Sequence, residues 1–281
     1  MADICAVGMG EAVWLGVVQG LTEFLPISST AHLRIVPALV GECDPGAAYT
    51  AVIQLGTLLA VLIYFMKDIG RILAAVGRAC LAPSRFREGD ARLGLAIALG
   101  TVPIGVLGIL FKKTIEGEAR SLYVIAATLI LLAVALFLAE KLARHERKIA
   151  DLGFWHIQLI GLAQALALVP GVSRSGVTLT AALFLAMRRD EAARFSFLLS
   201  IPAVTAAGIY EMKDVLAAAR ETGLGPVIVG VLVSLLAGVA TIHFLLRFLQ
   251  TRTTMVFVIY RIALGVLLLG LLGGGVLAAM G

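Results

Sequence analysis

The stretch Leu25-Pro26-Ile27-Ser28-Ser29-Thr30 interrupts an apolar region that runs from about residue 12 to residue 40. Proline lacks the backbone N–H that a helix interior needs, and its ring clashes with the preceding turn. The hydroxyl side chains that follow it are good caps for a new helix. The stretch therefore predicts a helix, a break and a second helix, folded back as a re-entrant hairpin.

A second interruption of this kind lies at Pro170-Gly171-Val172-Ser173-Arg174-Ser175-Gly176, within the apolar region 154–187. The rest of the chain holds six uninterrupted apolar stretches of roughly 20 residues, the length that crosses a bilayer as a helix. They cover residues 48–66, 93–111, 122–140, 195–212, 226–246 and 255–279. The sequence therefore predicts six spanning helices plus two re-entrant helix hairpins.

The composition of the chain supports the same fold class. Of its 281 residues, 60% are hydrophobic and 15% are charged, whereas soluble domains are about 45–50% apolar and about 25% charged. This excludes a disordered chain, a collagen-like chain and a soluble globular enzyme, and the long apolar runs are unlike the alternation of a transmembrane barrel. We expect an all-α polytopic membrane protein with a single membrane domain over residues 1–281.

Basic residues are distributed unevenly between the connections. Fifteen Lys and Arg lie in the connections at 67–92, 141–153, 188–194 and 247–252, and five lie in the opposite set. Cytoplasmic connections carry the excess of Lys and Arg. Both termini and the opening of the first hairpin are therefore predicted outside the cytoplasm. Because the net charge of +5 is explained by orientation, no nucleic acid partner is expected.

The two halves of the chain resemble one another. The segment 63–68 matches 209–214 at five of six positions, and further matches join the two interrupted regions. These are Gly16, Gln19 and Leu21 with Gly161, Gln164 and Leu166, and, after one gap, Pro26 and Ser29 with Pro170 and Ser173. We predict one repeat at about 10–145 and a second at about 154–281. Each contains three spans, an odd number, so the second is inserted upside down and the hairpin tips meet inside the membrane.

The first interruption carries polar side chains that could act in catalysis or bind a metal. Gln19 and Glu23 are four residues apart and share a helix face. A charged group at the bilayer centre costs about 2.5–3.5 kcal/mol on insertion scales, so Glu23 is predicted to be a general base or metal ligand. The alternative is a solvated Glu at an interfacial helix end. Ser29 and His32 add a nucleophile and a proton shuttle, unless they are only a helix cap and a bundle hydrogen bond.

The second interruption carries a group suited to anions. Arg174 presents a planar fork of donors that matches phosphate, although it could instead be a structural partner of Glu23. The half-helices that begin near Ser28 and Ser173 point their N-termini into the same site. These features predict a phosphate site. Gln54 either faces it or packs between helices, and Gln164 and Arg261 are expected to be structural.

The segments 19–32 and 170–176 resemble the two signature motifs of the bacterial undecaprenyl pyrophosphate phosphatases, the bacitracin-resistance family. The likeness extends to hairpin positions, span number and length, and so to nearly the whole chain. It implies an integral membrane phosphatase of the bacterial inner membrane. Such an enzyme hydrolyses undecaprenyl pyrophosphate to undecaprenyl phosphate, recycles the lipid carrier for peptidoglycan synthesis and confers bacitracin resistance. Two positions depart from the family: Gln19 stands where Glu is frequent, and Ala31 where Gly is common.

The resemblance also implies roles for single residues. We expect Ser29 to be the nucleophile, Glu23 the base and His32 a proton relay, with His32 itself as the alternative nucleophile. Mg²⁺ or Ca²⁺ would bridge Glu23, Gln19 and the pyrophosphate. The active site would face the extracytoplasmic side, the polyprenyl tail would stay in membrane lipid, and a homodimer is expected. The residues expected to bind the substrate are Arg174, Ser173, Ser175, Ser28, Thr30 and Gln54.

The rival hypothesis is a secondary transporter or flippase of a lipid phosphate or small anion, because inverted repeats with broken helices are typical of transporters. A cluster of Ser, Glu and His favours chemistry, since a transporter needs no nucleophile. Phosphate release in detergent, without a gradient, separates the two. A structural scaffold is disfavoured by the intramembrane Glu23 and Arg174. A soluble-type acid phosphatase site is disfavoured because its Lys/Arg/His pattern is not evident.

Overall fold

The computed structural model describes residues 7–40, 45–87, 89–111 and 121–277, and this part of the chain is helical with no β-strand. Each of the six predicted spans falls mainly on one helix. The predicted span 48–66 runs two residues past the end of its helix, and 255–279 runs beyond Gly273, with residues 278 and 279 outside the described part of the chain. Five of these helices, all except α3, are each long and apolar enough to cross a membrane, and α3 joins them when taken together with α4. The six are α3 (Gly46–Tyr64), α5 (Gly89–Leu110), α7 (Leu122–Leu142), α10 (Arg189–Thr222), α11 (Leu224–Thr251) and α12 (Met255–Gly273).

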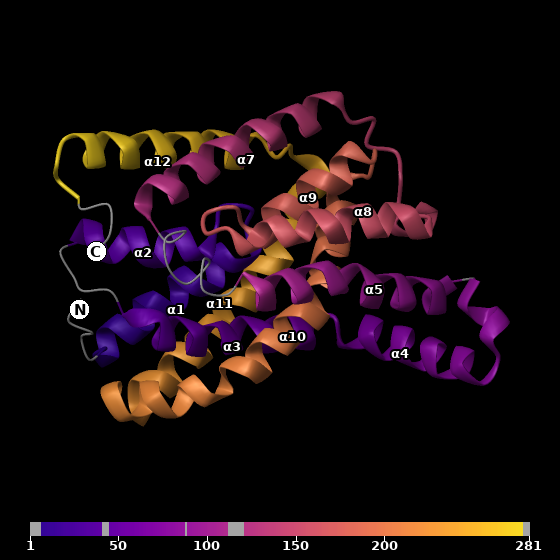
Figure 1. Ribbon diagram of the computed structural model, residues 1–281, viewed down its shortest axis with the longest axis horizontal. Helices are drawn as coiled ribbons and strands as arrows, with labels where there is room; N and C mark the ends of the chain where they lie inside the picture. Colours follow the sequence, from indigo (N-terminus) through magenta and orange to yellow (C-terminus); the bar gives the residue numbers. More distant parts are fainter. Residues whose placement is uncertain (1–6, 41–44, 88, 112–120, 278–281) are drawn as a thin grey trace.

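Both interrupted regions are helix, break and helix, as predicted. The first consists of α1 (Met9–Phe24) and α2 (Ser29–Val40). The second consists of α8 (Phe154–Gln164), continued by the 3-10 turn η4 (Ala165–Leu168), and α9 (Arg174–Phe184). In Figure 1 the two hairpins occupy opposite halves of the long axis, and their tips meet near the middle of the molecule.

Both breaks end at a serine that has the same unusual backbone conformation. Ser28 has φ +76° and Ser173 has φ +68°, in the left-handed region that side chains rarely adopt. Each serine caps the helix that follows, because its Oγ accepts the N–H of the third residue on, Ala31 at 3.4 Å and Gly176 at 3.1 Å. In backbone conformation and capping, Ser28 rather than Ser29 matches Ser173. The two serines are 145 positions apart, as are Gly16 and Gly161, so this match needs no gap.

The main helix pairings cross between the two halves of the chain. Hairpin helix α1 packs on α11, and hairpin helix α8 packs on α5. The pair α3 with α10 and the pair α7 with α12 also join the halves. Glycines permit this closeness: a Cβ on Gly161 would lie 2.3 Å from the carbonyl oxygen of Gly100. If each helix is replaced by the corresponding helix of the other half, the pair α1–α11 becomes α8–α5 and the reverse. The pairs α3–α10 and α7–α12 stay the same.

The halves differ where the matched segments 63–68 and 209–214 lie. In the first half the chain bends by 71° between α3 and α4 (Met66–Leu81), whereas α10 continues through the matching residues. Phe65, the mismatched position, is fully buried at the bend. It packs beside Phe197 and under the guanidinium of Arg194, 5.4 Å from its ring centre. The basic connection 67–92 is therefore largely helical, in α4 and η1 (Pro83–Arg87), which the sequence analysis did not predict.

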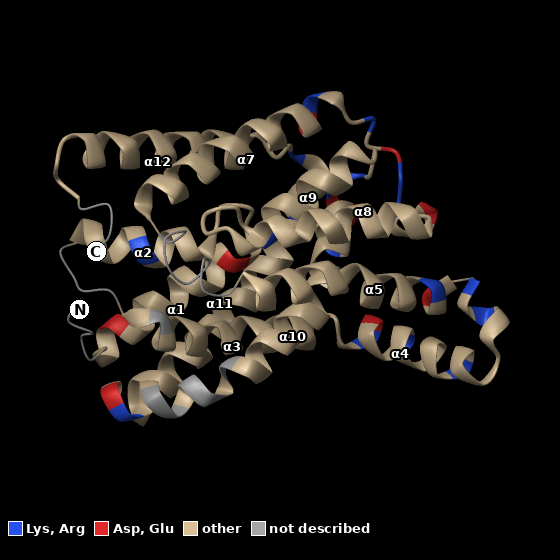
Figure 2. Cartoon of the chain, viewed as in Figure 1, with Lys and Arg blue, Asp and Glu red and all other residues tan. Residues whose placement is uncertain are grey.

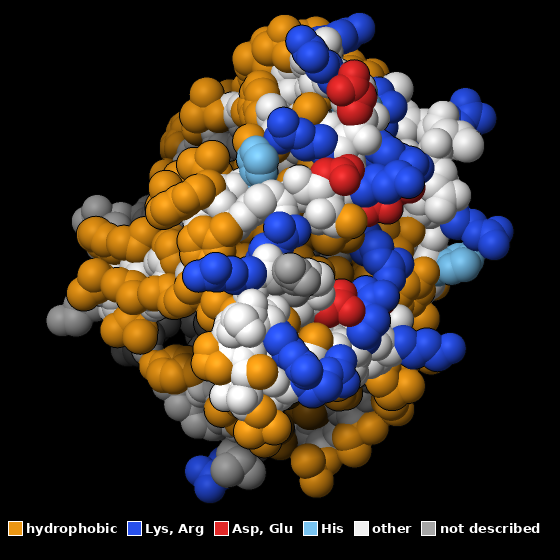
Figure 3. All heavy atoms as spheres, turned by 90° about the vertical axis from the view of Figure 1, so that its right-hand side faces the viewer, with side chains coloured by type: hydrophobic (Ala, Val, Ile, Leu, Met, Phe, Trp, Pro, Cys, Tyr) orange, Lys and Arg blue, Asp and Glu red, His pale blue; other side chains and the backbone are white. Residues whose placement is uncertain are grey.

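The surface has an apolar side and a charged end. The apolar window of α5 has mean hydropathy 2.3, yet only 17% of it is buried, as expected for a helix that faces lipid. Charged side chains gather at one end of the molecule, where α4 and α7 end and α5 and α8 begin (Figure 2). Most of the charged side chains in the view onto that end are Lys and Arg (Figure 3). Of the five basic residues in the opposite connections, Lys112, Lys113 and Arg120 lie outside the described residues. The protein is a multi-pass membrane protein.

Candidate active site

A small pocket of about 150 Å³ lies where the two hairpin tips meet. Small-molecule sites usually measure about 300–1,000 Å³, so this one suits a headgroup rather than a long polyprenyl chain. Six of the predicted site residues line it: Glu23, Ser29, Thr30, Gln54, Ser173 and Arg174, together with Ile104 and Ala167. The last two could not be identified from the sequence, because they are apolar residues within apolar segments.

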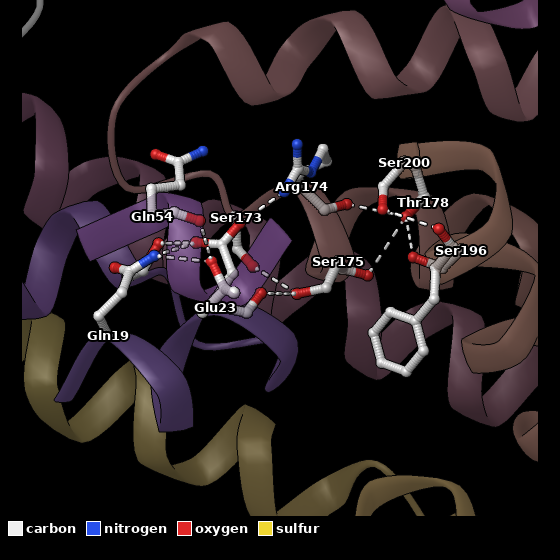
Figure 4. A network of polar contacts seen from close by, with 12 residues as sticks. Gln19, Glu23, Gln54, Ser173, Arg174, Ser175, Thr178, Ser196 and Ser200 are labelled. Carbon is white, nitrogen blue, oxygen red and sulfur yellow. Dashed lines mark hydrogen bonds and ion pairs between the residues drawn. The ribbon is translucent and has the colours of Figure 1, made fainter. Parts of the chain in front are cut away.

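Glu23 is the centre of the polar contacts in this pocket. Its Oε2 accepts hydrogen bonds from Ser29 Oγ at 2.6 Å and from Gln19 Nε2 at 3.1 Å. Its Oε1 lies 2.5 Å from Nη2 of Arg174, and only 8% of the Glu23 side chain is exposed. Figure 4 shows Glu23 of α1 and Arg174 of α9 reaching toward one another. A hydroxyl that donates to a buried carboxylate is the arrangement that activates a nucleophile.

The second hairpin is locked onto the first around this ion pair. Ser175 Oγ donates to the carbonyl oxygen of Leu25 at 3.1 Å, and it lies 3.1 Å from Ser173 Oγ. Behind Ser175, Thr178 forms a short hydrogen bond with Ser196 of α10, which continues the polar contacts into the bundle (Figure 4). Ser175 is buried and does not line the pocket, so its role in this structure is to hold the two tips together.

Two helices begin at the pocket. Ser29 is the first residue of α2 and Arg174 is the first residue of α9, and both line the cavity. Helix N-termini present free N–H groups and a partial positive charge. With the guanidinium of Arg174, they form a site for an anion such as a phosphate.

His32 is close to the site but does not line the pocket. The residue is 5% exposed, and both ring nitrogens have partners. Nδ1 lies 2.7 Å from the carbonyl oxygen of Ser28, and Nε2 lies 2.6 Å from the hydroxyl of Tyr260 on α12. In this structure His32 supports the turn that carries Ser28 and Ser29.

Arg261 of α12 is fully buried and contacts both hairpin breaks. Its Nη1 donates to the carbonyl oxygen of Pro26 at 3.1 Å, and its Nη2 donates to that of Gly171 at 3.0 Å. Its remaining bonds reach the carbonyl oxygens of Val172 and, on α7, Thr128 and Leu129. The expected structural role is confirmed, but the sequence did not predict that this residue joins the two tips. An Arg within an apolar span was the available signal.

The pocket offers few side chains that could bind a divalent ion. The described residues contain no group of three or more His, Cys, Asp and Glu placed to hold a metal. One carboxylate, Glu23, faces the pocket, and Mg²⁺ is often held by one or two carboxylates together with substrate phosphates. Gln19 is buried, and its Nε2 contacts Glu23 and Thr57. The residues therefore fit an ion that arrives with a pyrophosphate, with Glu23 as its protein ligand.

A larger pocket of about 450 Å³ opens at the charged end of the molecule. Four of its seven charged side chains form ion pairs: Arg194 lies 2.6 Å from Asp68, and Arg71 lies 3.0 Å from Asp90. Among its lining residues there is no Ser, Thr, Cys or His. The smaller pocket, which has a nucleophile beside a base, is therefore the candidate active site.

Comparison with known proteins agrees with this geometry. The family model described as bacitracin resistance protein BacA matches residues 12–267. The chain belongs to the BacA family. The resemblance found in the two motifs is thereby confirmed, and the match includes both motifs, five complete spans and most of α12.

Curated relatives are similar along nearly their whole length. The undecaprenyl-diphosphatase of Myxococcus xanthus (strain DK1622) is 57% identical over 270 residues, which cover 96% of this chain and 91% of that protein. The undecaprenyl-diphosphatase of Prosthecochloris aestuarii is 52% identical over 275 residues, covering 94% and 97%. That of Chloroherpeton thalassium is 53% identical over 278 residues, covering 96% and 98%.

Proposed function

We infer that this chain hydrolyses undecaprenyl diphosphate to undecaprenyl phosphate and inorganic phosphate, with Ser29 as the nucleophile. The membership in the BacA family and the names of its relatives support the activity. The observation that carries the mechanism is the hydroxyl of Ser29, 2.6 Å from the carboxylate of Glu23 in a pocket that also holds Arg174. This activity regenerates the lipid carrier for peptidoglycan synthesis and underlies bacitracin resistance.

The proposed first step transfers the terminal phosphoryl group to the enzyme. Ser29 Oγ attacks the terminal phosphorus while Glu23 takes the hydroxyl proton. The bond from that phosphorus to the bridging oxygen breaks, and undecaprenyl phosphate leaves. In the second step water attacks the phosphoserine, inorganic phosphate leaves, and Ser29 recovers its proton. The sum is one phosphoanhydride bond hydrolysed by one water molecule.

The second hairpin supplies the grip on the phosphate. In the structure Arg174 pairs with Glu23 at 2.5 Å. We propose that the phosphate oxygens take over part of this contact, which frees Glu23 to act as the base. Ser173, Thr30 and Gln54 line the pocket and add hydrogen bonds to the substrate. Ser28 contributes by capping α2, and Ser175 by holding the two tips together.

We assign His32 the relay of the proton during hydrolysis of the phosphoserine. The alternative, attack by His32 itself, would require a ring nitrogen to leave its partner and enter the pocket. A divalent metal, Mg²⁺ or Ca²⁺, would bind Glu23 and the pyrophosphate and neutralise charge on the phosphate oxygens. Gln19, the second proposed ligand, contacts Glu23 rather than the pocket in this structure.

The remaining parts of the proposal concern the membrane. We propose two inverted repeats, supported by the matching serine caps and the crossed helix pairings. The basic end is assigned to the cytoplasm by the positive-inside rule. The pocket then opens to the extracytoplasmic side of the inner membrane. The expected homodimer stays a prediction.

The direct test uses purified protein in detergent with undecaprenyl diphosphate and Mg²⁺, and it measures released phosphate. Glu23→Ala and Arg174→Ala should each lower turnover by about 10²-fold or more. Arg188→Ala is the matched control, because it removes an arginine from an exposed ion pair with Asp190 and should leave turnover unchanged. Turnover close to wild type in either pocket variant would remove the proposed site. Transport of phosphate without hydrolysis would favour the transporter hypothesis.

A further inference from the structure

The hydroxyl of Tyr260 contacts a residue that the mechanism requires, although it lies outside the pocket. Its oxygen is 2.6 Å from Nε2 of His32. The two rings lie parallel within 9°, with centres 5.6 Å apart. Neither distance in sequence nor residue type predicts this pair, because the residues are 228 positions apart.

The opposite ring nitrogen fixes the direction of this hydrogen bond. Nδ1 of His32 faces the carbonyl oxygen of Ser28 at 2.7 Å, and a carbonyl can only accept. Nδ1 therefore carries the hydrogen, and in the neutral ring Nε2 accepts the hydroxyl hydrogen of Tyr260. When Nε2 takes up a proton, the same hydroxyl can turn and accept from it. A tyrosine at this position suits a ring that gains and loses a proton.

Two features keep Tyr260 in place. The residue is 42% exposed on the apolar surface, where a hydroxyl has no water to bind within the bilayer core. His32 is the polar partner of this hydroxyl in the structure, and the hydrogen bond is therefore expected to persist. The next residue, Arg261, ties the same turn of α12 to the carbonyl oxygens of Pro26 and Gly171. Helix α12 is thus anchored to the tips by Arg261 as well as to the first hairpin through His32.

We propose that Tyr260 is a positioning residue for His32, holding its ring in place and in the Nδ1-protonated tautomer. This inference rests on the proposed function, in which His32 takes part in hydrolysis. Tyr260 touches neither the substrate pocket nor Glu23, so its effect passes through His32.

A double-mutant cycle with phosphate release as the readout tests the inference. Tyr260→Phe should lower kcat by about five- to tenfold, the usual value of one hydrogen bond, and change KM little. In a His32→Ala background the same substitution should have no further effect, because its target is gone. Tyr64→Phe is the matched control: Tyr64 also pairs with a histidine, His243 at 3.4 Å, but away from the pocket. It should change turnover in neither background.

The outcomes separate the inference from the proposed function. Full turnover in His32→Ala would remove the relay role and with it the basis of the inference. A strong loss in His32→Ala with full turnover in Tyr260→Phe would overturn the inference alone. Equal losses from Tyr260→Phe in both backgrounds would make its role structural.

A spectroscopic measurement applies even where His32→Ala is too slow to assay. The ¹⁵N signals of His32 are those lost from labelled protein in the His32→Ala variant. Tyr260→Phe should shift them, and Tyr64→Phe should shift those of His243 instead. Unchanged His32 signals in Tyr260→Phe would contradict the inference.

Discussion

The two hairpins share a backbone and differ in chemistry. Both break at a serine with positive φ that caps the following half-helix. Counted from these caps, the positions of Glu23, Ser29 and His32 in the first hairpin are taken by Leu168, Arg174 and Val177 in the second. The first hairpin therefore holds the proposed reacting groups, and the second holds the guanidinium of Arg174, which is proposed to bind the phosphate. Two hairpins with the same capped break thus bring different side chains to one pocket.

Gln19 and Gln164 differ in their hydrogen bonds because the two hairpins carry different side chains. Gln19 donates to Glu23 at 3.1 Å and to Thr57 at 3.3 Å. Its counterpart Gln164 is fully buried, and neither atom of its amide has a hydrogen-bond partner among the described residues. The interhelical hydrogen bond expected for Gln164 is thus not seen. Because Leu168 stands where the first hairpin has Glu23, the second hairpin keeps the amide without its acceptor.

The largest effect should follow from removing the nucleophile. Ser29→Ala should lower kcat by about 10³-fold or more, with little change in KM, because the fold of the tip is kept by Ser28. The measurement is phosphate release from undecaprenyl diphosphate. Ser173→Ala, at the cap of the other hairpin, should cost about tenfold at most. Similar losses in both variants would contradict the division of labour between the hairpins.

The next effect concerns the shape of the cation in the second hairpin. Arg174→Lys keeps the charge but loses the planar fork, so kcat/KM should fall by about 10- to 100-fold. Unlike in Ser29→Ala, a clear share of the loss should fall on KM. Arg188→Lys, in an exposed pair, is the matched control and should be neutral. A change confined to kcat would place Arg174 with the reacting groups instead.

A third prediction concerns the residue that joins the hairpins. Arg261→Lys cannot keep the set of bonds to carbonyl oxygens of both tips and α7, so the free energy of unfolding should fall by about 2–4 kcal/mol. Thermal unfolding in detergent measures this, with Arg252→Lys at the exposed charged end as control. Amide hydrogen exchange should quicken at both tips together. Faster exchange at one tip alone would show that the hairpins are held separately.

Much of the fold could be predicted from the sequence, and so could the main polar residues of each hairpin. Apolar runs of span length mark the long helices, and Pro26 and Pro170 with their serines mark the breaks, because these signals are local. Glu23 and Arg174 stood out because charges within apolar segments need a partner. Their contact at 2.5 Å follows the predicted meeting of the tips.

The contacts that depend on the packing of distant helices could not be predicted. The bend after Tyr64, the partners of Arg261 and the pairing of Tyr260 with His32 are set by where α12 and α10 pack. The sequence comparison paired Ser29 with Ser173, whereas the backbone conformation matches Ser28 with Ser173. Both candidates are serines, so residue type does not distinguish them.

The smallest effect compares the glutamines directly. Gln164→Leu should raise the free energy of unfolding by about 1–3 kcal/mol, because it removes a buried amide without partners. Gln19→Leu should lower it by a similar amount and reduce turnover, since Glu23 and Thr57 lose a donor. Thermal unfolding of the two variants in one detergent gives the comparison. A destabilising Gln164→Leu would mean that its amide has a partner in the membrane.

The most direct test of the account is to trap the phosphoryl group on the enzyme. Protein mixed with undecaprenyl diphosphate labelled in its terminal phosphate would be quenched within one turnover, digested and mapped by mass spectrometry. The account predicts an acid-stable label on the peptide that contains Ser29, lost in Ser29→Ala and retained in Arg188→Ala. An acid-labile label on His32, or turnover without label on either residue, would contradict it.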